Sequence, residues 1–147
     1  MQKSLKLIGA VLLCQIIGGL GAVFTTPAIG GWYAGLVKPI FNPPNWLFGP
    51  VWTLLYAMMA VAWWLVGFKE KKIFLTQLGV NLLWSIVFFG LKQPGVAVGV
   101  IVVLWVLIFL TIRKFMSINK LGGWLLYPYL LWVSFATILN VAITILN

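Results

Sequence analysis

The stretch WLFGPVWTLLYAMMAVAWWLVGF occupies residues 46–68 and holds no charged side chain. A helix of about 20 predominantly apolar residues is long enough to cross the ~30 Å hydrocarbon core of a bilayer. The stretch also lacks the strict alternation of apolar and polar residues that is typical of membrane-barrel strands. It therefore predicts a membrane-spanning helix.

Four further apolar segments of similar length lie before and after this one. Together the five spans are expected at about residues 7–24, 46–68, 73–91, 95–112 and 124–146. We therefore predict a single domain over residues 1–147, an all-α integral membrane protein that forms a five-transmembrane-helix bundle.

The composition of the whole chain agrees with a membrane protein and excludes several functional classes. Of the 147 residues 63% are hydrophobic and 7% charged, with Glu70 as the one acidic residue and with no histidine. These counts exclude hydrolysis by paired carboxylates, a metal site built on carboxylates or histidines, and haem ligation by histidine. No charged residue lies in the middle of a predicted span, which argues against proton-coupled transport.

The basic residues predict the orientation in the membrane. Of the ten Lys and Arg residues, only Lys38 and Lys92 fall on the side of the first and third loops. The others lie at the amino terminus and in the second and fourth loops: Lys3, Lys6, Lys69, Lys71, Lys72, Arg113, Lys114 and Lys120. By the positive-inside rule, we expect a cytoplasmic amino terminus and a carboxyl terminus on the outside. The basic residues are scattered between apolar runs, so no nucleic-acid partner is expected.

The first loop, residues 25–45, is the longest connection and is rich in Pro and Gly. It also holds Trp32, Tyr33, Ile40 and Phe41, which is too much apolar surface for a solvated linker. We predict that this loop folds back over the bundle as a lid, with a short helix around residues 31–37.

Polar residues in the third span share one helix face. Gln77, Asn81 and Ser85 recur every four residues. They either join helices by hydrogen bonds or form one wall of a ligand pocket. Helix packing is favoured for Gln77, and both interpretations stay open for Asn81.

In the fifth span Trp132, Ala136 and Asn140 recur at the same spacing. The small Ala136 beneath Trp132 leaves room that a flat ligand fills, unless these aromatic residues only pack the helices together. Pro128 cannot donate its amide, so a kink is expected near it.

Pairs of small residues in two spans permit close helix approach. Gly95 and Gly99 form a G-x-x-x-G pair, and Gly18 and Ala22 form a related pair. Packing within the chain and a homodimer face are both open interpretations.

Three blocks of sequence are recognisable as a set. The first is Trp32-Tyr33, Lys38-Pro39, Phe41, Pro43-Pro44, Trp46, Phe48-Gly49-Pro50-Val51-Trp52-Thr53 and Tyr56. The second is Asn81-Leu82-Leu83-Trp84-Ser85 with Phe88-Phe89, and the third is Pro128-Tyr129 with Trp132, Phe135-Ala136 and Leu139-Asn140. From the first loop to the end of the chain, the sequence resembles the translocator protein/tryptophan-rich sensory protein (TspO/MBR) family, also known as the peripheral-type benzodiazepine receptors.

This resemblance implies a five-helix bundle, often dimeric, whose first loop covers a pocket. Members of the family bind porphyrins such as protoporphyrin IX and haem, sterols and synthetic benzodiazepine-type drugs. The ligand-binding residues that the resemblance implies are Trp32, Tyr33 and Pro43 in the lid, Phe48 and Trp52 in the second helix, Asn81, Trp84 and Phe88 in the third, and Trp132 and Ala136 in the fifth. The carboxyl-terminal residues 139–147, LNVAITILN, lack the Tyr and the basic residue of a cholesterol motif, so sterol binding is less expected.

On this basis we expect a membrane receptor or carrier of porphyrins with a sensory or transport role in tetrapyrrole homeostasis. Porphyrin or haem is the expected ligand, and no cofactor is expected to be required. Without histidine, we expect recognition of the macrocycle rather than of the iron. The acidic side arms would meet Lys38 or Arg113. The expected partners are this ligand, the lipid bilayer and a second copy of the chain in a homodimer.

The alternative is light- and oxygen-dependent porphyrin degradation. The resemblance implies this alternative, because in some bacterial relatives such breakdown is linked to the two deep tryptophans that match Trp52 and Trp132. No embedded acid–base pair is available for other catalysis, so a binding protein is favoured over an enzyme and no metal site is expected.

Overall fold

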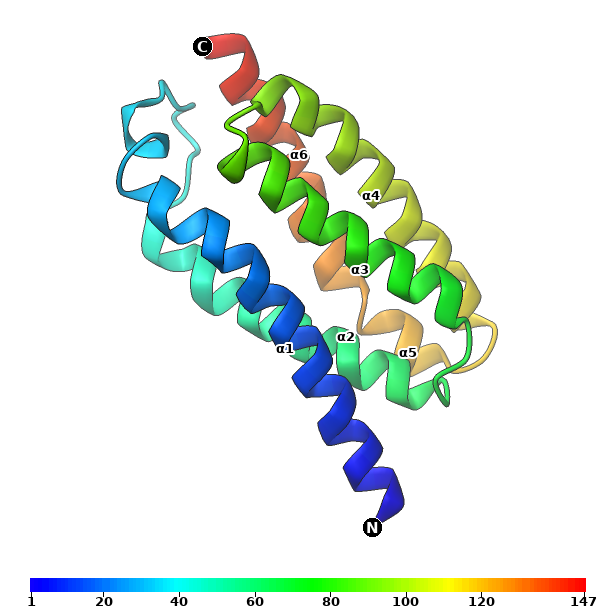
Figure 1. Cartoon of the computed structure of the whole chain (residues 1–147). Helices are drawn as coiled ribbons and strands as arrows, with labels where there is room; N and C mark the ends of the chain where they lie inside the picture. Colours follow the sequence, from blue (N-terminus) through cyan, green and yellow to red (C-terminus); the bar gives the residue numbers. More distant parts are fainter.

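The computed structural model describes all 147 residues, and its regular secondary structure is entirely helical, without strands (Figure 1). Five helical stretches are long and apolar enough to cross a membrane: Gln2–Ile29, Asn45–Leu65, Lys71–Gly90, Pro94–Met116 and Lys120–Leu146. The predicted fold class, a five-helix membrane bundle, is confirmed.

The helices form a closed ring. Their bounds are α1 Gln2–Ile29, α2 Phe48–Leu65, α3 Lys71–Ser85, α4 Pro94–Met116, α5 Lys120–Trp124 and α6 Tyr127–Leu146. Around the ring, α1 packs on α2 and α3, α3 packs on α4, and α4 packs on α5 and α6. The ring closes where α5 packs on the end of α2. The side-by-side course of these helices can be followed in Figure 1.

The first helix is longer than expected at both ends. It starts at Gln2 and runs through Pro27 to Ile29. Lys3 can sit on the helix because a lysine stem lies along apolar surface while its ammonium reaches the interface. The Lys3 carbonyl also accepts a hydrogen bond from Trp64 Nε1 at 3.1 Å. The connection to α2 is therefore shorter than the predicted loop, and we call residues 30–44 the lid segment.

The lid segment folds back toward the bundle, as predicted. A single 3₁₀ turn, Tyr33–Gly35, stands where a short helix is expected, and a second turn, Asn45–Leu47, leads into α2. Tyr33 is only 2% exposed. This aromatic side chain therefore anchors the lid segment among the helices.

The fifth span is broken rather than smoothly kinked. Residues 125–126 separate α5 from α6, and Pro128 lies in the first turn of α6, where its missing amide is tolerated. The short α5 begins at an N-cap, since Asn119 Oδ1 accepts a hydrogen bond from Gly122 N at 3.1 Å. A Cβ at Gly122 would lie 3.2 Å from the Ala62 carbonyl oxygen, so glycine allows α5 to pack closely on α2.

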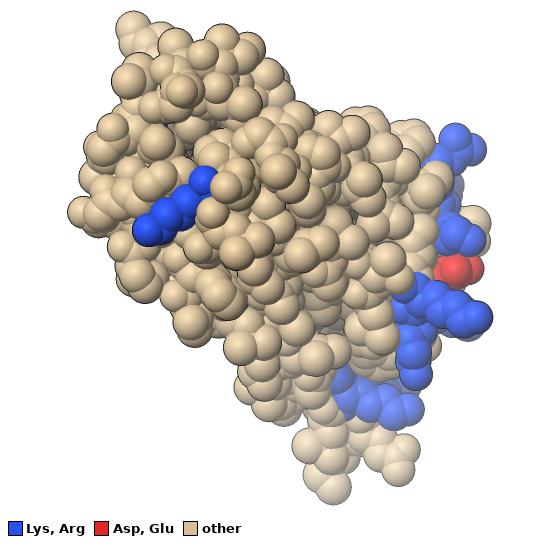
Figure 2. Space-filling view, turned by 45° about the horizontal axis from the view of Figure 1, so that its top comes forward, with Lys and Arg blue, Asp and Glu red and all other residues tan.

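The charged residues gather at the end of the bundle opposite the lid segment. On the face that Figure 2 shows, the blue Lys and Arg side chains cluster at one end around the red Glu70, and one blue side chain lies apart. Glu70 forms an exposed ion pair with Lys114, with 3.6 Å between Oε2 and Nζ. This distribution agrees with the sequence pattern behind the predicted orientation, which itself stays a prediction.

Candidate ligand-binding cavity

A cavity of about 610 Å³ lies between the helices next to the lid segment. Its 26 lining residues come from α1, the lid segment, the start of α2, the end of α3 with the turn that follows, and α6. Ligand pockets in proteins are typically clefts of about 300–1,000 Å³ with mostly apolar walls. The cavity therefore has the size and lining of a small-molecule site.

Tyr33 closes the lid end of the cavity. Its ring lies 6.5 Å from Phe48, 6.3 Å from Phe88 and 5.7 Å from Phe89, measured between centroids. Its hydroxyl donates a 2.8 Å hydrogen bond to Asn42 Oδ1. Burial raises the pKa of Tyr33 to about 12, so the hydroxyl stays neutral at physiological pH.

Two sets of hydrogen bonds order the lid segment, one within the segment and one that ties it to the residue after α6. Lys38 Nζ donates to the carbonyl oxygens of Tyr33 at 2.9 Å and Leu36 at 3.1 Å, and it lies 5.0 Å from the centre of the Tyr33 ring. The side chain of Asn147 accepts from Val37 N at 3.0 Å and donates to the Val37 carbonyl at 2.8 Å. The side-chain amide of Asn147 thus bonds both the backbone N–H and the carbonyl of Val37 and ties the lid segment to the end of α6.

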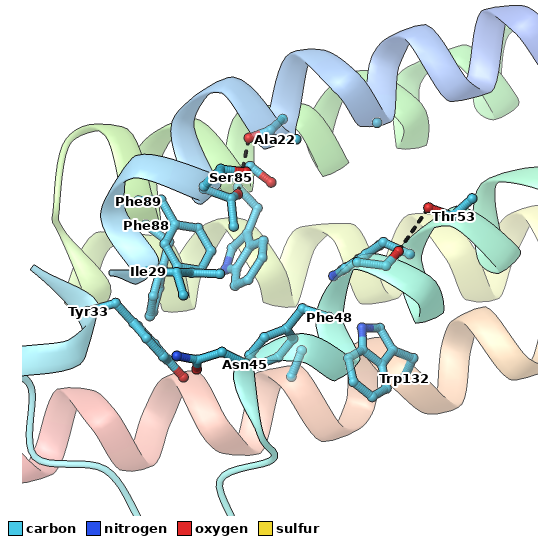
Figure 3. A pocket seen from close by; sticks show the side chains of 18 of the residues that line it. Ala22, Ile29, Tyr33, Asn45, Phe48, Thr53, Ser85, Phe88, Phe89 and Trp132 are labelled. Carbon is cyan, nitrogen blue, oxygen red and sulfur yellow. Dashed lines mark hydrogen bonds between the residues drawn. The ribbon is translucent and has the colours of Figure 1, made fainter. Parts of the chain in front are cut away.

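Aromatic rings from α2 and α6 form one wall. Phe48 and Trp52 lie one helical turn apart on α2 and both meet the Trp132 ring edge-to-face, with centroids 6.1 and 6.5 Å away. The Trp132 indole N–H is buried without a hydrogen-bond partner. Figure 3 shows Phe48, Trp132 and Tyr33 around the same hollow. These rings offer the flat apolar surface on which another ring system stacks.

A π-helical turn, Ile86–Gly90, shapes the opposite wall. Leu91 N donates to the Ile86 carbonyl, five residues back, at 2.7 Å. Such a turn inserts an extra residue into a helix and often occurs at functional sites. Phe88 and Phe89 are both buried on the cavity here, as Figure 3 also shows.

A chain of buried hydrogen bonds lies below the cavity. Tyr56 OH donates to Asn81 Oδ1 at 2.8 Å, Asn81 Nδ2 donates to Tyr129 OH at 2.6 Å, and Tyr129 OH donates to Gln77 Oε1 at 2.8 Å. We call these four residues the polar bridge. It joins α2, α3 and α6 and occupies both polar atoms of Asn81. In the structure, Asn81 therefore joins helices by hydrogen bonds, the role that the sequence favoured for Gln77.

The structure brings seven of the ten predicted ligand-binding residues onto the cavity wall: Tyr33, Phe48, Trp52, Trp84, Phe88, Trp132 and Ala136. It does not bring Trp32, Pro43 or Asn81 there. Trp32 packs edge-to-face on Phe88 at 5.8 Å, and Pro43 lies half-buried in the lid segment. These two residues support the lid segment without lining the hollow.

Sequence reasoning missed the wall that α1 supplies. This wall consists of Gln15, Gly18, Gly19, Gly21, Ala22, Thr25, Thr26 and Ile29. Its signal was the run of small residues GGLGA at 18–22. The close approach predicted from Gly18 is present, because a Cβ there would lie 2.7 Å from the Tyr56 ring. At Gly99 a Cβ would meet nothing within 4 Å, so this glycine has no close neighbour in its own chain.

Further lining residues complete the cavity. They are Asn45, Trp46, Gly49, Thr53 and Tyr56 from α2 and the turn before it, Ser85 and Phe89 from the third span, and Phe135, Leu139, Asn140 and Ile143 from α6. No charged side chain is among them, and no cluster of three or more His, Cys, Asp or Glu residues is present in the chain. The arrangement is suited to binding a ligand through shape and ring contacts.

Comparison with known proteins agrees with this geometry. Residues 10–146 match the sequence profile of the TspO/MBR family. The chain is 45% identical over 153 aligned positions to the tryptophan-rich protein TspO of Archaeoglobus fulgidus, covering 99% of both chains. It is 36% identical over 137 positions to the tryptophan-rich sensory protein of Cereibacter sphaeroides, covering 88% of this chain and 87% of that one. It is 39% identical over 119 positions to the translocator protein of Homo sapiens, covering 74% and 70%.

Proposed function

Because this chain belongs to the TspO/MBR family, we propose that it is a membrane receptor or carrier for porphyrins and related flat apolar ligands. Membership in the family supports a sensory or transport role in a membrane. In this proposal the ligand, such as protoporphyrin IX or haem, lies in the cavity beside the lid segment. The role would then be in tetrapyrrole homeostasis.

The observation that carries the proposal is the ring-lined cavity. Tyr33, Phe48, Phe88 and Trp132 all face a hollow of about 610 Å³. Each ring pair contributes about 0.5–1.5 kcal/mol beyond the burial of its area. A macrocycle with an extended π-system uses several such contacts at once, whereas a branched or strongly polar ligand does not.

Neither basic residue expected to meet the acidic side arms lies on the cavity wall. Arg113 is in the last turn of α4, at the end of the bundle away from the lid segment. The Lys38 ammonium is occupied by carbonyl oxygens of the lid segment. We therefore propose that the acid groups of a bound porphyrin extend out of the cavity toward the membrane interface.

Recognition of the ring system rather than of its metal has a direct consequence. No histidine is present and no cluster of metal-ligating residues is found. Protoporphyrin IX should therefore bind at least as tightly as haem in parallel titrations. Binding of haem alone would contradict recognition through the macrocycle.

The binding proposal is tested by titrating the purified protein with protoporphyrin IX and following tryptophan fluorescence, corrected for porphyrin absorption. We expect saturable quenching whose affinity falls in the Trp132→Phe variant. Trp105→Phe is the control, because Trp105 stacks on Phe109 and bonds Ser134 outside the cavity. Quenching that never saturates after correction would overturn the proposal.

A second candidate function is light- and oxygen-dependent porphyrin degradation. It is favoured by the edge-to-face contact of Trp52 and Trp132 on the wall that the macrocycle would touch. Illumination of the porphyrin complex in air, with porphyrin absorbance as the readout, tests it. Equal bleaching rates in wild type, Trp52→Phe and Trp132→Phe would remove these residues from any such reaction.

We further propose that the lid segment faces the outside and that two copies associate in the membrane. The first proposal rests on the basic residues at the other end of the bundle. The second rests on Gly95 and Gly99, where an added Cβ meets little or nothing of the same chain. Accessibility of single introduced cysteines and crosslinking in native membranes test the two proposals.

A further inference from the structure

We propose that the cavity exchanges its ligand sideways with the lipid bilayer, through a slot between α1 and the start of α2, while the lid segment stays closed. This inference rests on the proposed ligand-binding function. It narrows the ligand class to amphiphilic flat molecules that dissolve in the membrane, and it names the route by which they reach the site.

The cavity wall is exposed on one side only. Its exposed lining residues are Gly19, Ala22 and Thr26 of α1 together with Asn45, Trp46, Gly49 and Thr53 at the start of α2. We call the opening between these two sets the slot. Every lining residue from the lid segment, the third span and α6 is buried or half-buried. The wall is therefore open between two helices and closed elsewhere.

The two helices touch below the slot, and the glycines above these contacts have open space around them. Gln15 Nε2 donates to the Thr53 carbonyl at 3.0 Å, and the Tyr56 ring packs against Gly18. Above these contacts, an added Cβ at Gly19 or Gly49 would meet no heavy atom within 4 Å. Above the Gln15–Thr53 bond, no hydrogen bond joins the exposed lining residues of α1 to those at the start of α2, so a flat molecule that enters edge-on breaks none between them.

The lid segment, in contrast, is fastened at several points. Asn147 is bonded twice to Val37, Lys38 bonds two lid carbonyls, and Tyr33 is buried among phenylalanines. Movement of the lid segment as a whole would break both Asn147 bonds and expose Tyr33, whereas the Lys38 bonds lie within the segment and would move with it. The slot is the path that costs the protein fewer interactions.

The residues around the slot indicate that the ligand comes from the lipid bilayer. Leu20 and Val23 on α1 are exposed apolar side chains that directly follow the slot residues Gly19 and Ala22, as expected of a surface that faces lipid. Trp46 is 71% exposed beside them, at a position suited to the interface between acyl chains and headgroups. The slot thus opens into the upper part of the hydrocarbon layer, with water and headgroups close to the lid end.

The slot edge itself is polar but uncharged, with Thr26, Asn45 and Thr53 on it. A ligand with an apolar ring body and acidic arms fits this arrangement. The body slides between the helices, and the arms remain near the interface, where they keep their hydration. A fully apolar molecule would leave these polar groups uncovered, and a highly charged one would not enter the lipid.

A second hollow offers the competing route, on the other side of the same wall. It lies between α2 and α6 and is lined by Val51, Leu54, Leu55, Met58, Pro128, Leu131, Trp132 and Phe135. Trp132 and Phe135 line both hollows, so their side chains separate the two. A ligand that used this side would have to displace both rings.

The test measures exchange rates in the full-length protein reconstituted in lipid nanodiscs, by stopped-flow tryptophan quenching with protoporphyrin IX. Gly19→Phe and Ala22→Phe narrow the slot, and Gly19→Ala is the small-side-chain control. Gly9→Phe is the matched control on the lipid face of α1, where a Cβ also meets nothing within 4 Å and the cavity is distant. Leu131→Phe fills the competing hollow, and Asn147→Ala loosens the lid segment.

We expect Gly19→Phe and Ala22→Phe to slow association and dissociation by the same factor, about tenfold, since a narrowed passage changes rates without changing the end states. Gly9→Phe, Leu131→Phe and Asn147→Ala should exchange at the wild-type rate, and Gly19→Ala should slow exchange less than Gly19→Phe. Equal rates in all variants would overturn the slot, as would a faster rate in Asn147→Ala or a slower one in Leu131→Phe. If Gly19→Phe or Ala22→Phe changed only the dissociation rate and so lowered the affinity, that result would also contradict passage through the slot. If the wild type shows no saturable binding, the proposed function fails, and the slot fails with it.

Discussion

Both ends of the bundle hold buried aromatic rings, yet one end is solid and the other hollow. Away from the lid segment, Trp63 stacks on Phe74 with centroids 4.5 Å apart, and Phe74 stacks on Phe115 at 6.1 Å. We call these three buried residues the packed end. Next to the lid segment, rings of the same kinds surround a cavity of about 610 Å³. Aromatic content alone therefore does not distinguish a core from a binding site.

The difference comes from what faces the rings. At the packed end, rings from α2, α3 and α4 meet one another directly. At the hollow end, the rings face glycine and alanine on α1, which are too small to fill the space. The polar bridge lies between the two ends and holds α2, α3 and α6 at fixed spacing. The cavity exists because one helix contributes little side-chain volume.

The sharpest test of this contrast is truncation at the packed end. Phe74→Ala should lower the free energy of unfolding by about 3–5 kcal/mol, because it leaves a void among fully buried rings. Phe88→Ala should cost clearly less, since its ring already borders a hollow. Unfolding of both variants in detergent, followed by circular dichroism, measures the difference. Equal losses would mean that the two ends are packed alike.

The polar bridge provides the next largest effect. Asn81→Ala leaves the buried Tyr56 hydroxyl without its acceptor and removes a bond to Tyr129, so a loss of about 1–3 kcal/mol in stability is expected. Tyr56→Phe removes one bond and leaves only the Asn81 Oδ1 without its donor, whereas Asn81→Ala breaks two bonds, so Tyr56→Phe should cost less. The same detergent unfolding assay compares them. A neutral Asn81→Ala variant would show that the bridge does not hold the helices.

The hollow end should respond in affinity instead. Trp132→Ala removes one ring from the cavity wall, and we expect about tenfold weaker porphyrin binding from the lost ring contact and burial. Trp105→Ala, outside the cavity, should bind like the wild type. Equilibrium titration with protoporphyrin IX, read by porphyrin fluorescence, gives both values. Equal affinities in the two variants would show that the aromatic wall of the cavity does not contribute to porphyrin binding.

The smallest effect concerns the lid segment and pH. Burial raises the pKa of Tyr33 to about 12 from an ordinary value of about 10. Its stabilising contribution is therefore complete below about pH 10 and is lost as the pH rises through 12. The tyrosinate absorbance difference between wild type and Tyr33→Phe should be flat at neutral pH and appear only above pH 10. A Tyr33 that titrates at its ordinary pKa would show that the lid segment does not bury it.

Sequence patterns predicted much of this protein, for reasons that particular residues illustrate. Residues 46–68 predict a membrane-spanning helix because an unbroken apolar helix of this length crosses the hydrocarbon core of a bilayer. The resemblance to the family brought Phe48, Trp52 and Trp132 together, although they lie far apart in the chain. The lid segment was foreseen from Trp32 and Tyr33, which are too apolar to remain in water. The span and the lid segment depend on residue type or on a local pattern, whereas the meeting of the three rings was expected only from the resemblance to the family.

The positions that sequence reasoning did not place depend on packing. Asn81 carries the same amide whether it meets a ligand or two tyrosines, and only the arrangement of α2 and α6 around it shows which. Gly19 and Ala22 look like helix-contact residues, yet both are exposed and line the cavity, and a Cβ at Gly19 would meet nothing within 4 Å. Spacing along a helix predicts a face but not the distance to the next helix.

The amino-acid sequence by itself determined the membrane location, the helical class and the family, because hydrophobicity, the lack of embedded charge and the tryptophan blocks are properties of the linear chain. The tertiary structure alone decided where the bundle is solid and where it is hollow. That outcome depends on which side chains face one another across helices, and the distance between α1 and its neighbours has no counterpart in the order of the residues.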